Sequence, residues 1–114
     1  MLENLKVLDF SRYIAGPYCG ALLAGLGSEV IRVERPEGGE DRFVGPVGDD
    51  ISALFLKTGC AKKSVTLNFR NEKSSKIVAK LVENADVVIA NMPPKVLTQN
   101  GLDYETLNRI NPKI

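Results

Sequence analysis

The stretch VLDFSRYIAGPYCGALLAGLGSEVIRVE, residues 7–34, decides the fold. Its start belongs to an almost unbroken apolar run from Leu5 to Phe10, which has the length of a buried parallel strand. Pro17 favours a helix start near that position, because a residue in the first helical turn needs no N–H for an intrahelical hydrogen bond. Gly20 in the helix interior suggests a close approach to the sheet, and Glu29 to Glu34 is a second strand-length run. The stretch therefore predicts a right-handed parallel strand–helix–strand unit.

The rest of the chain continues the alternation of strands and helices. Residues Lys62 to Phe69 alternate apolar and polar side chains, which predicts a strand at or near a sheet edge. Asn71 is the expected N-cap of a helix from Glu72 to Asn84, whose lysines form a solvated face. The run from Asp86 to Asn91 is apolar between its two polar ends and predicts a central strand.

Three short helices complete the pattern. One is expected from Ile51 to Lys57 with Asp50 or Ser52 near its cap, and a second from Lys95 to Gln99. A third runs from Tyr104 to Ile110, capped by Asp103 and stopped by Asn111-Pro112. The predicted fold is a single α/β domain over residues 1–114, with a mainly parallel sheet and flanking helices.

Composition narrows the classes of function. The 114 residues carry a net charge of +1 with acids and bases interspersed, which does not favour nucleic-acid binding. Neither a long apolar segment nor a signal peptide is present, so no membrane association and a cytoplasmic location are expected. Cys19 and Cys60, in a chain without histidine, predict no metal site and no disulfide, only buried or idle thiols. Any catalysis here must use carboxylates, lysine or tyrosine.

Ligands of such sheets bind beyond the carboxyl ends of the strands. The loops expected there contain Arg12, Arg35 and Arg70, whose guanidinium groups suit phosphate. The same arginines are equally suited to pair with nearby acids such as Glu34, Glu37 and Glu40, and spacing alone leaves both options open. The glycines match neither a dinucleotide fingerprint nor a P-loop, so generic NAD or ATP binding is disfavoured.

Several segments together resemble the N-terminal part of the family III CoA-transferases, which include formyl-CoA and carnitine CoA-transferases and α-methylacyl-CoA racemases. The resemblance covers essentially the whole chain in the family's order, and its segments are LKVLDFSRYIAGPYCGALLAGLGSEVIRVERPEGGED, KKSVTLNF, ENADVVIANMPP and GLDYETLNRINPK. It implies a Rossmann-like large domain that binds coenzyme A at the rim described above.

The resemblance also implies the residues that contact coenzyme A. Ile14 and Ala15 would enclose the adenine, and Arg35 and Arg70 would contact phosphate. Gln99 stands where related enzymes often carry arginine. The full set of implied contacts is Arg12, Tyr13, Ile14, Ala15, Arg35, Leu67, Asn68, Phe69, Arg70, Asn91, Met92, Pro93 and Gln99.

Members of this family use an aspartate that forms an acyl anhydride and then an aspartyl-CoA thioester. The resemblance places that aspartate beyond Ile114, so we expect a truncated portion of the enzyme with no catalytic residue of its own. Asp9, Asp86 and Asp103 suit strand ends and caps, and the remaining three, Asp41, Asp49 and Asp50, fall in a long Gly/Pro-rich loop expected to be mobile.

Two classes of function therefore remain. The first is the CoA-binding portion of an acyl-CoA:carboxylate CoA-transferase, with acyl-CoA and a carboxylic acid as substrates, or of an acyl-CoA racemase. The second is a noncatalytic CoA-binding or assembly module. The resemblance further implies a homodimer, and a truncated chain would need a complementing C-terminal chain.

Overall fold

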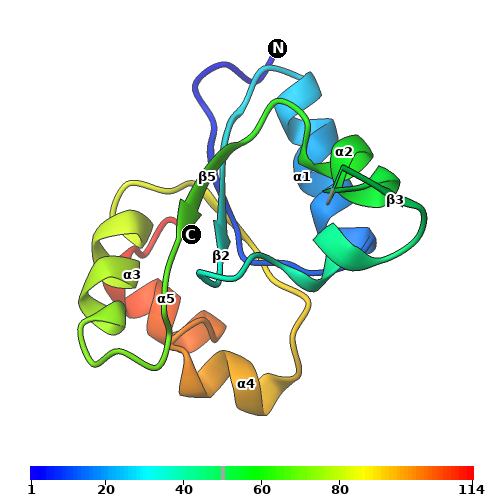
Figure 1. Cartoon of the computed structure of the whole chain (residues 1–114). Coiled ribbons are helices and arrows are strands. Elements are labelled where there is room, and N and C mark those ends of the chain that lie inside the picture. Colours follow the sequence, from blue (N-terminus) through cyan, green and yellow to red (C-terminus); the bar gives the residue numbers. More distant parts are fainter. Residues whose placement is uncertain (50) are drawn as a thin grey trace.

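A computed structural model describes residues 1–49 and 51–114, and the cap suggested at Asp50 lies outside these residues. Its centre is a four-stranded, fully parallel sheet in the order β5-β2-β1-β6 (Figure 1). The strands are β1 (Lys6–Asp9), β2 (Glu29–Glu34), β5 (Lys63–Thr66) and β6 (Val87–Ile89). The predicted α/β class and parallel sheet are confirmed.

Helices cover both faces of the sheet (Figure 1). One side carries α1 (Ala15–Gly25) with α2 (Ala53–Gly59), and the other carries α3 (Ser74–Val82) with α5 (Tyr104–Ile110). The short helix α4 (Pro94–Gln99) follows β6. The 3-10 turn η1 (Glu40–Phe43) and the hairpin of β3 (Val47–Gly48) and β4 (Ile51–Ser52) lie between β2 and α2.

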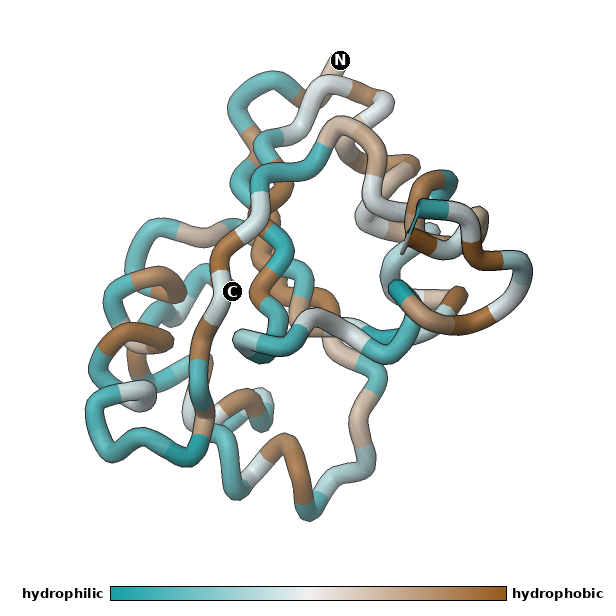
Figure 2. The backbone as a smooth tube through the Cα atoms, viewed as in Figure 1, coloured by the Kyte–Doolittle hydropathy of each residue, from teal (hydrophilic) through white to brown (hydrophobic). Residues whose placement is uncertain are grey.

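The two faces of the sheet have different chemistry. Leu8 of β1, Phe10 directly after β1 and Val33 of β2 pack with α3 and α5 in an apolar core that also contains Val82. Full burial of each such side chain contributes about 1.5–3 kcal/mol. Figure 2 shows apolar residues along the central strands and at intervals along the helices.

The opposite face alternates apolar and charged residues. Val7 and Val30 are neighbours across β1 and β2, and the next pair along is Asp9 and Arg32. All four are at most 2% exposed. A buried ionic layer therefore separates the sheet from α1 and α2.

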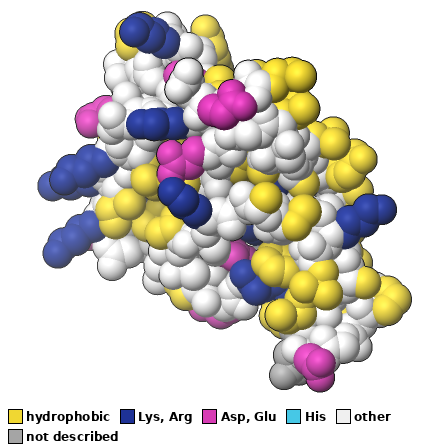
Figure 3. Space-filling view, turned by 90° about the horizontal axis from the view of Figure 1, so that it is seen from above, with side chains coloured by type: hydrophobic (Ala, Val, Ile, Leu, Met, Phe, Trp, Pro, Cys, Tyr) yellow, Lys and Arg dark blue, Asp and Glu magenta, His cyan; other side chains and the backbone are white. Residues whose placement is uncertain are grey.

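The outer surface of α1 is apolar as well. Exposed side chains recur at every fourth residue, namely Ile14, Tyr18, Leu22 and Leu26. Figure 3 shows exposed apolar side chains gathered on the side of the molecule that carries α1 and α2, with Lys and Arg side chains projecting from the opposite edge.

Some expectations were wrong in detail. β6 is an edge strand among the described residues, since it pairs only with β1 there, and its side chains are half-buried. The helix expected from Glu72 begins at Ser74, because the Asn71 side chain accepts from the N–H of Lys73 within a preceding turn. α1 begins two residues before Pro17.

Other local predictions are confirmed. β2 and α5 have the predicted bounds, and Asp103 caps α5 by accepting from the N–H of Thr106. Ser52 caps α2 through the N–H of Phe55. Of the two alternatives for the thiols, the buried one is wrong, because Cys19 and Cys60 are both exposed.

Candidate functional site

The carboxyl ends of the four parallel strands meet on one rim. A cleft on this rim is lined by Ser11 and Arg12 after β1 and by Arg35 after β2. Phe69, beyond β5, and Met92, beyond β6, line it as well. The structure thus brings together side chains from all four predicted loops, because parallel strands end at the same edge.

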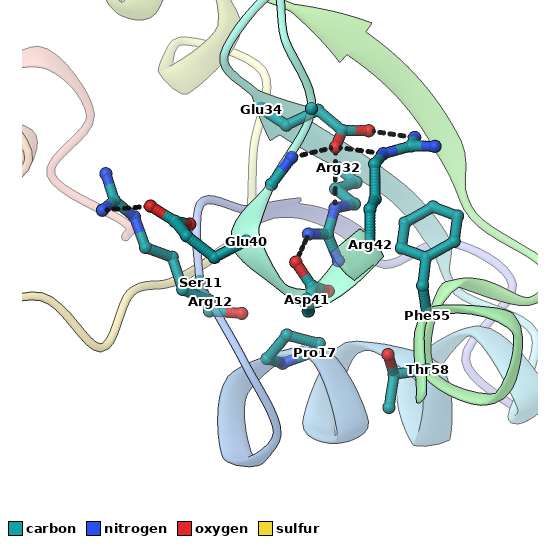
Figure 4. A network of polar contacts seen from close by, with 12 residues as sticks. Ser11, Arg12, Pro17, Arg32, Glu34, Glu40, Asp41, Arg42, Phe55 and Thr58 are labelled. Atoms are coloured by element: carbon teal, nitrogen blue, oxygen red, sulfur yellow. Dashed lines mark hydrogen bonds and ion pairs between the residues drawn. The ribbon is translucent and has the colours of Figure 1, made fainter. Parts of the chain in front are cut away.

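Two guanidinium groups meet at one carboxylate in this cleft. Nη1 of Arg12 lies 3.1 Å, and Nη1 of Arg35 lies 3.4 Å, from Oε1 of Glu40 (the Arg12 contact is drawn in Figure 4). Both arginine side chains remain close to half exposed. Arg35 is further oriented by its Nε, which donates to the carbonyl of Gly38 at 2.7 Å. Of the acids considered as partners for the arginines, the structure selects Glu40.

The loop that carries Arg12 is held by the loop after β6. The Arg12 N–H donates to Oδ1 of Asn91 and Nδ2 of Asn91 donates to the Arg12 carbonyl, both at 2.8 Å. On the other side, a Cβ at Gly16 would lie 2.1 Å from Cβ of Ser11, so only glycine allows α1 to start this close to the loop.

A buried ion pair fixes the first turn of α1. Nζ of Lys62 donates at 2.7 Å to Oδ2 of Asp9 and at 2.7 Å to the carbonyl of Pro17, and the lysine side chain is 1% exposed. Asp9 also accepts from the N–H and hydroxyl of Ser11. A Cβ at Gly20 would come within 2.8 Å of Oδ2 of Asp9, which confirms that this glycine permits a close approach.

A second set of charges holds the loop after β2 (Figure 4). Burial raises the pKa of Glu34, but hydrogen bonds from Arg42, the Gly39 N–H and Ser64, together with the charge of Arg32, lower that pKa to about 2.

Asp41 extends this set of charges into the interior. Nη2 of Arg32 donates to Oδ1 of Asp41 at 2.6 Å, and Asp41 is fully buried. Arg32 and Arg42 also contact the ring of Phe55, with Arg42 3.9 Å from its centroid. The expectation of a mobile loop was therefore wrong for Asp41, because its carboxylate is anchored in the ionic layer.

The other expected contact residues are spread along the rim. Tyr13 and Ile14 are exposed beside Arg12, Tyr13 with a left-handed φ of 63°, and Ala15 begins α1. Leu67 belongs to the apolar core, whereas Asn68 and Arg70 are exposed in a turn where Oδ1 of Asn68 accepts from the Arg70 N–H. Pro93 precedes α4 and Gln99 is its last residue, and Gln99 does not line the cleft, although its neighbour Asn100 does.

Sequence reasoning missed Lys62, Ser11 and the bridging position of Glu40. Asp9 at the end of a buried strand was the available signal, since a carboxylate there requires a cation. The partner itself lies 53 residues away along the chain, so the pairing needed the fold. Among the described residues, no group of three potential ligands is arranged to hold a metal ion, and no helix is long and apolar enough to cross a membrane.

A parallel sheet flanked by helices places the chain in the α/β class, in which ligands commonly bind beyond the carboxyl ends of the strands. Comparison with known proteins specifies the family. The model of CoA-transferase family III matches residues 2–114, so the chain belongs to this family.

The relatives agree with this assignment. Succinate–glutarate CoA-transferase of Agrobacterium fabrum is 39% identical over 121 residues, which cover 99% of this chain and 30% of that protein. Human succinyl-CoA:glutarate CoA-transferase is 41% identical, with 99% of this chain and 26% of that protein covered. The chain therefore spans less than a third of these relatives.

Solved structures show the same fold. A CAIB/BAIF family protein from Brucella suis is 41% identical with a TM-score of 0.87, covering 96% of this chain and 30% of that one. The hypothetical protein Rv3272 of Mycobacterium tuberculosis is 35% identical with a TM-score of 0.90, covering 100% of this chain and 32% of that one.

Proposed function

We propose that this chain is the CoA-binding portion of an acyl-CoA:carboxylate CoA-transferase. The observation that carries the proposal is the convergence of Arg12 and Arg35 on one carboxylate at the rim of the sheet. Guanidinium groups that donate to a carboxylate oxygen also suit a phosphate oxygen, and coenzyme A is a phosphate-rich substrate. Family membership supports a CoA thioester as the ligand.

The rim offers a role for each part of the ligand. Arg12 and Arg35 bind phosphate, and Arg70 supplies a further guanidinium from the loop beyond β5. Ile14, which is 61% exposed, and Ala15 enclose the adenine, since an exposed apolar side chain gains from covering an aromatic ring. The remaining contacts come from the loops beyond β1, β5 and β6 and from the end of α4, that is Tyr13, Leu67, Asn68, Phe69, Asn91, Met92, Pro93 and Gln99.

The nucleophile belongs to residues outside this sequence. Asp9 and Asp41 are buried in ion pairs, Asp86 accepts from the Lys6 N–H, and Asp103 caps α5. In the proposed reaction, an aspartate carboxylate attacks the thioester carbonyl and releases the CoA thiolate. The thiolate then attacks the aspartyl carbonyl of the anhydride, which gives an aspartyl-CoA thioester and frees the first carboxylic acid.

Because these four aspartates have structural roles, a second candidate is a noncatalytic CoA-binding module. Both candidates bind coenzyme A, so only a measurement of turnover distinguishes them. An acyl-CoA racemase portion is the third option, and it differs from the transferase in exchanging the α-proton of the acyl group.

Assembly with a second copy, or with a chain carrying the missing part, is proposed for each. A relative named as the beta subunit of succinyl-CoA–L-malate CoA-transferase of Chloroflexus aurantiacus supports a two-chain arrangement.

Calorimetric titration of the purified protein with coenzyme A tests the binding claim. We expect saturable binding that weakens several-fold in Arg35→Ala, with Lys76→Ala on the exposed face of α3 as the matched control. Unchanged affinity in Arg35→Ala would refute the phosphate assignment. Incubation with an acyl-CoA and an acceptor acid tests turnover, and we expect none from this chain alone; transfer without added protein would contradict that expectation.

A further inference from the structure

Glu40 occupies a position that the proposed function gives to the ligand. One oxygen of its carboxylate, Oε1, faces both Arg12 and Arg35. A phosphate oxygen that binds both guanidinium groups needs the same location, because carboxylates and phosphates use the same donors. The two anions also repel each other at such a distance. Glu40 and a bound phosphate therefore compete for the same Nη1 donors of this pair of arginines.

The backbone on both sides of Glu40 is fixed. The N–H of Gly39 donates to Oε2 of Glu34 at 2.9 Å. A Cβ at Gly39 would lie 2.6 Å from Arg32 and 2.6 Å from Asp41, so the chain is tightly packed there.

Asp41 secures the other side. Its carboxylate accepts from Arg32, and its carbonyl accepts from the Ser52 hydroxyl at 2.5 Å. Since both neighbours are anchored, displacement of Glu40 requires only a rotation of its own side chain, which lies at the edge of the cleft and is 24% exposed.

We propose that Glu40 is an internal competitor for the ligand's phosphate, and that its side chain must leave the Arg12–Arg35 pair before a phosphate-bearing ligand binds there. This inference rests on the proposed CoA site. Glu40 raises the affinity that a ligand needs, because an anion must displace this carboxylate before it can bind both guanidinium groups. Weakly charged ligands are therefore disfavoured. The carboxylate also keeps the two arginines from pairing with other acids.

The test compares the affinity for coenzyme A of the unmodified protein, Glu40→Gln and Glu37→Gln by calorimetry. Gln keeps the size of the side chain and removes its charge. Glu37 is exposed in the same loop and controls for the general loss of a negative charge. We expect Glu40→Gln to bind coenzyme A about two- to fivefold more tightly, the range of a partly exposed charge pair, and Glu37→Gln to bind as the unmodified protein does.

Equal or weaker binding by Glu40→Gln would overturn the inference, and weaker binding would show instead that Glu40 positions the arginines. If the unmodified protein and both variants all fail to bind coenzyme A, the proposed function fails as well. The two failures are thus distinguishable.

Truncated ligands identify the phosphate involved. A gain seen with coenzyme A and with dephospho-CoA assigns the competition to the diphosphate, whereas a gain with coenzyme A alone assigns it to the 3′-phosphate. Pantetheine carries no phosphate, so a similar gain with pantetheine would contradict competition. In an Arg35→Ala background, the gain from Glu40→Gln should shrink, because one of the shared donors has gone.

Discussion

Asn91 and Arg12 form a closed ring of two hydrogen bonds. The side-chain amide of Asn91 bonds the backbone N–H and carbonyl of Arg12, as a neighbouring strand would. The ring continues the pairing of β1 and β6 beyond the ends of both strands, where the last ladder contact is the Phe10 N–H to the Ile89 carbonyl at 2.9 Å. Arg12 consequently leaves the sheet from a fixed backbone position. Its guanidinium reaches Glu40 from a rigid base.

Replacement of Asn91 tests this support. Asn91→Ala removes both hydrogen bonds, and we expect the free energy of unfolding to fall by about 1–3 kcal/mol, because each bond contributes about 0.5–1.5 kcal/mol. Affinity for coenzyme A should fall as well, since Arg12 loses its fixed base. Urea unfolding and calorimetry measure the two effects. A loss of stability with unchanged affinity would show that the ring does not position Arg12.

The buried pair of Lys62 and Asp9 makes a prediction about stability. Lys62→Met leaves the Asp9 carboxylate buried without a cation, which costs about 3–5 kcal/mol in comparable sites. Lys63→Met, at a lysine whose side chain is 71% exposed, is the control and should change stability by less than about 1 kcal/mol. Equal effects of the two substitutions in urea unfolding would contradict the role given to Lys62.

Gly20 and Gly25 lie in the same helix but in different surroundings. A methyl group at Gly20 would meet Oδ2 of Asp9 at 2.8 Å and Nζ of Lys62 at 2.9 Å, whereas nothing lies within 4 Å of the same position at Gly25. We therefore expect Gly20→Ala to lower the melting temperature, despite the higher helix propensity of alanine, and Gly25→Ala to preserve or raise it. A higher melting temperature for Gly20→Ala would show that the pair relaxes to accommodate the methyl group.

The lowered pKa of Glu34 predicts that the stability of the protein depends on pH. Its pKa is lowered from 4.5 to about 2 in the folded protein, so the folded state binds fewer protons than the unfolded state between these values. The stabilisation is present above pH 4.5 and is lost as the pH falls toward 2. Urea unfolding between pH 6 and pH 3 should therefore show a shallower loss of stability in Glu34→Gln than in the unmodified protein. Parallel curves would refute this assignment.

The elements that sequence predicts well are those with local signals. α5 has the expected bounds because Asp103 and Asn111-Pro112 define its ends within a few residues. β6 was placed wrongly because an apolar run reports burial on two faces, and it says nothing about which strands lie beside it.

The order of predicted strands indicates which loops form the rim, but it does not indicate which side chains pair within the rim. Arg12 and Glu40 are 28 residues apart, and the choice of Glu40 over Glu37 depends on how η1 turns, which a Gly/Pro-rich sequence leaves undetermined. The ionic layer was missed for the same reason. Arg32 was counted within a strand-length run, although its charge requires the buried carboxylate of Asp41, which comes from another segment.

The alternation along β2 has a consequence for pairing. Ile31 and Val33 face one layer, while Arg32 and Glu34 face the other. A slip of this strand by one residue would insert two charged groups into the hydrocarbon interior and leave Asp41 and Arg42 opposite apolar side chains. The charged residues of β2 thus allow only one pairing register with its neighbouring strands. A uniformly aliphatic strand would tolerate a shifted register.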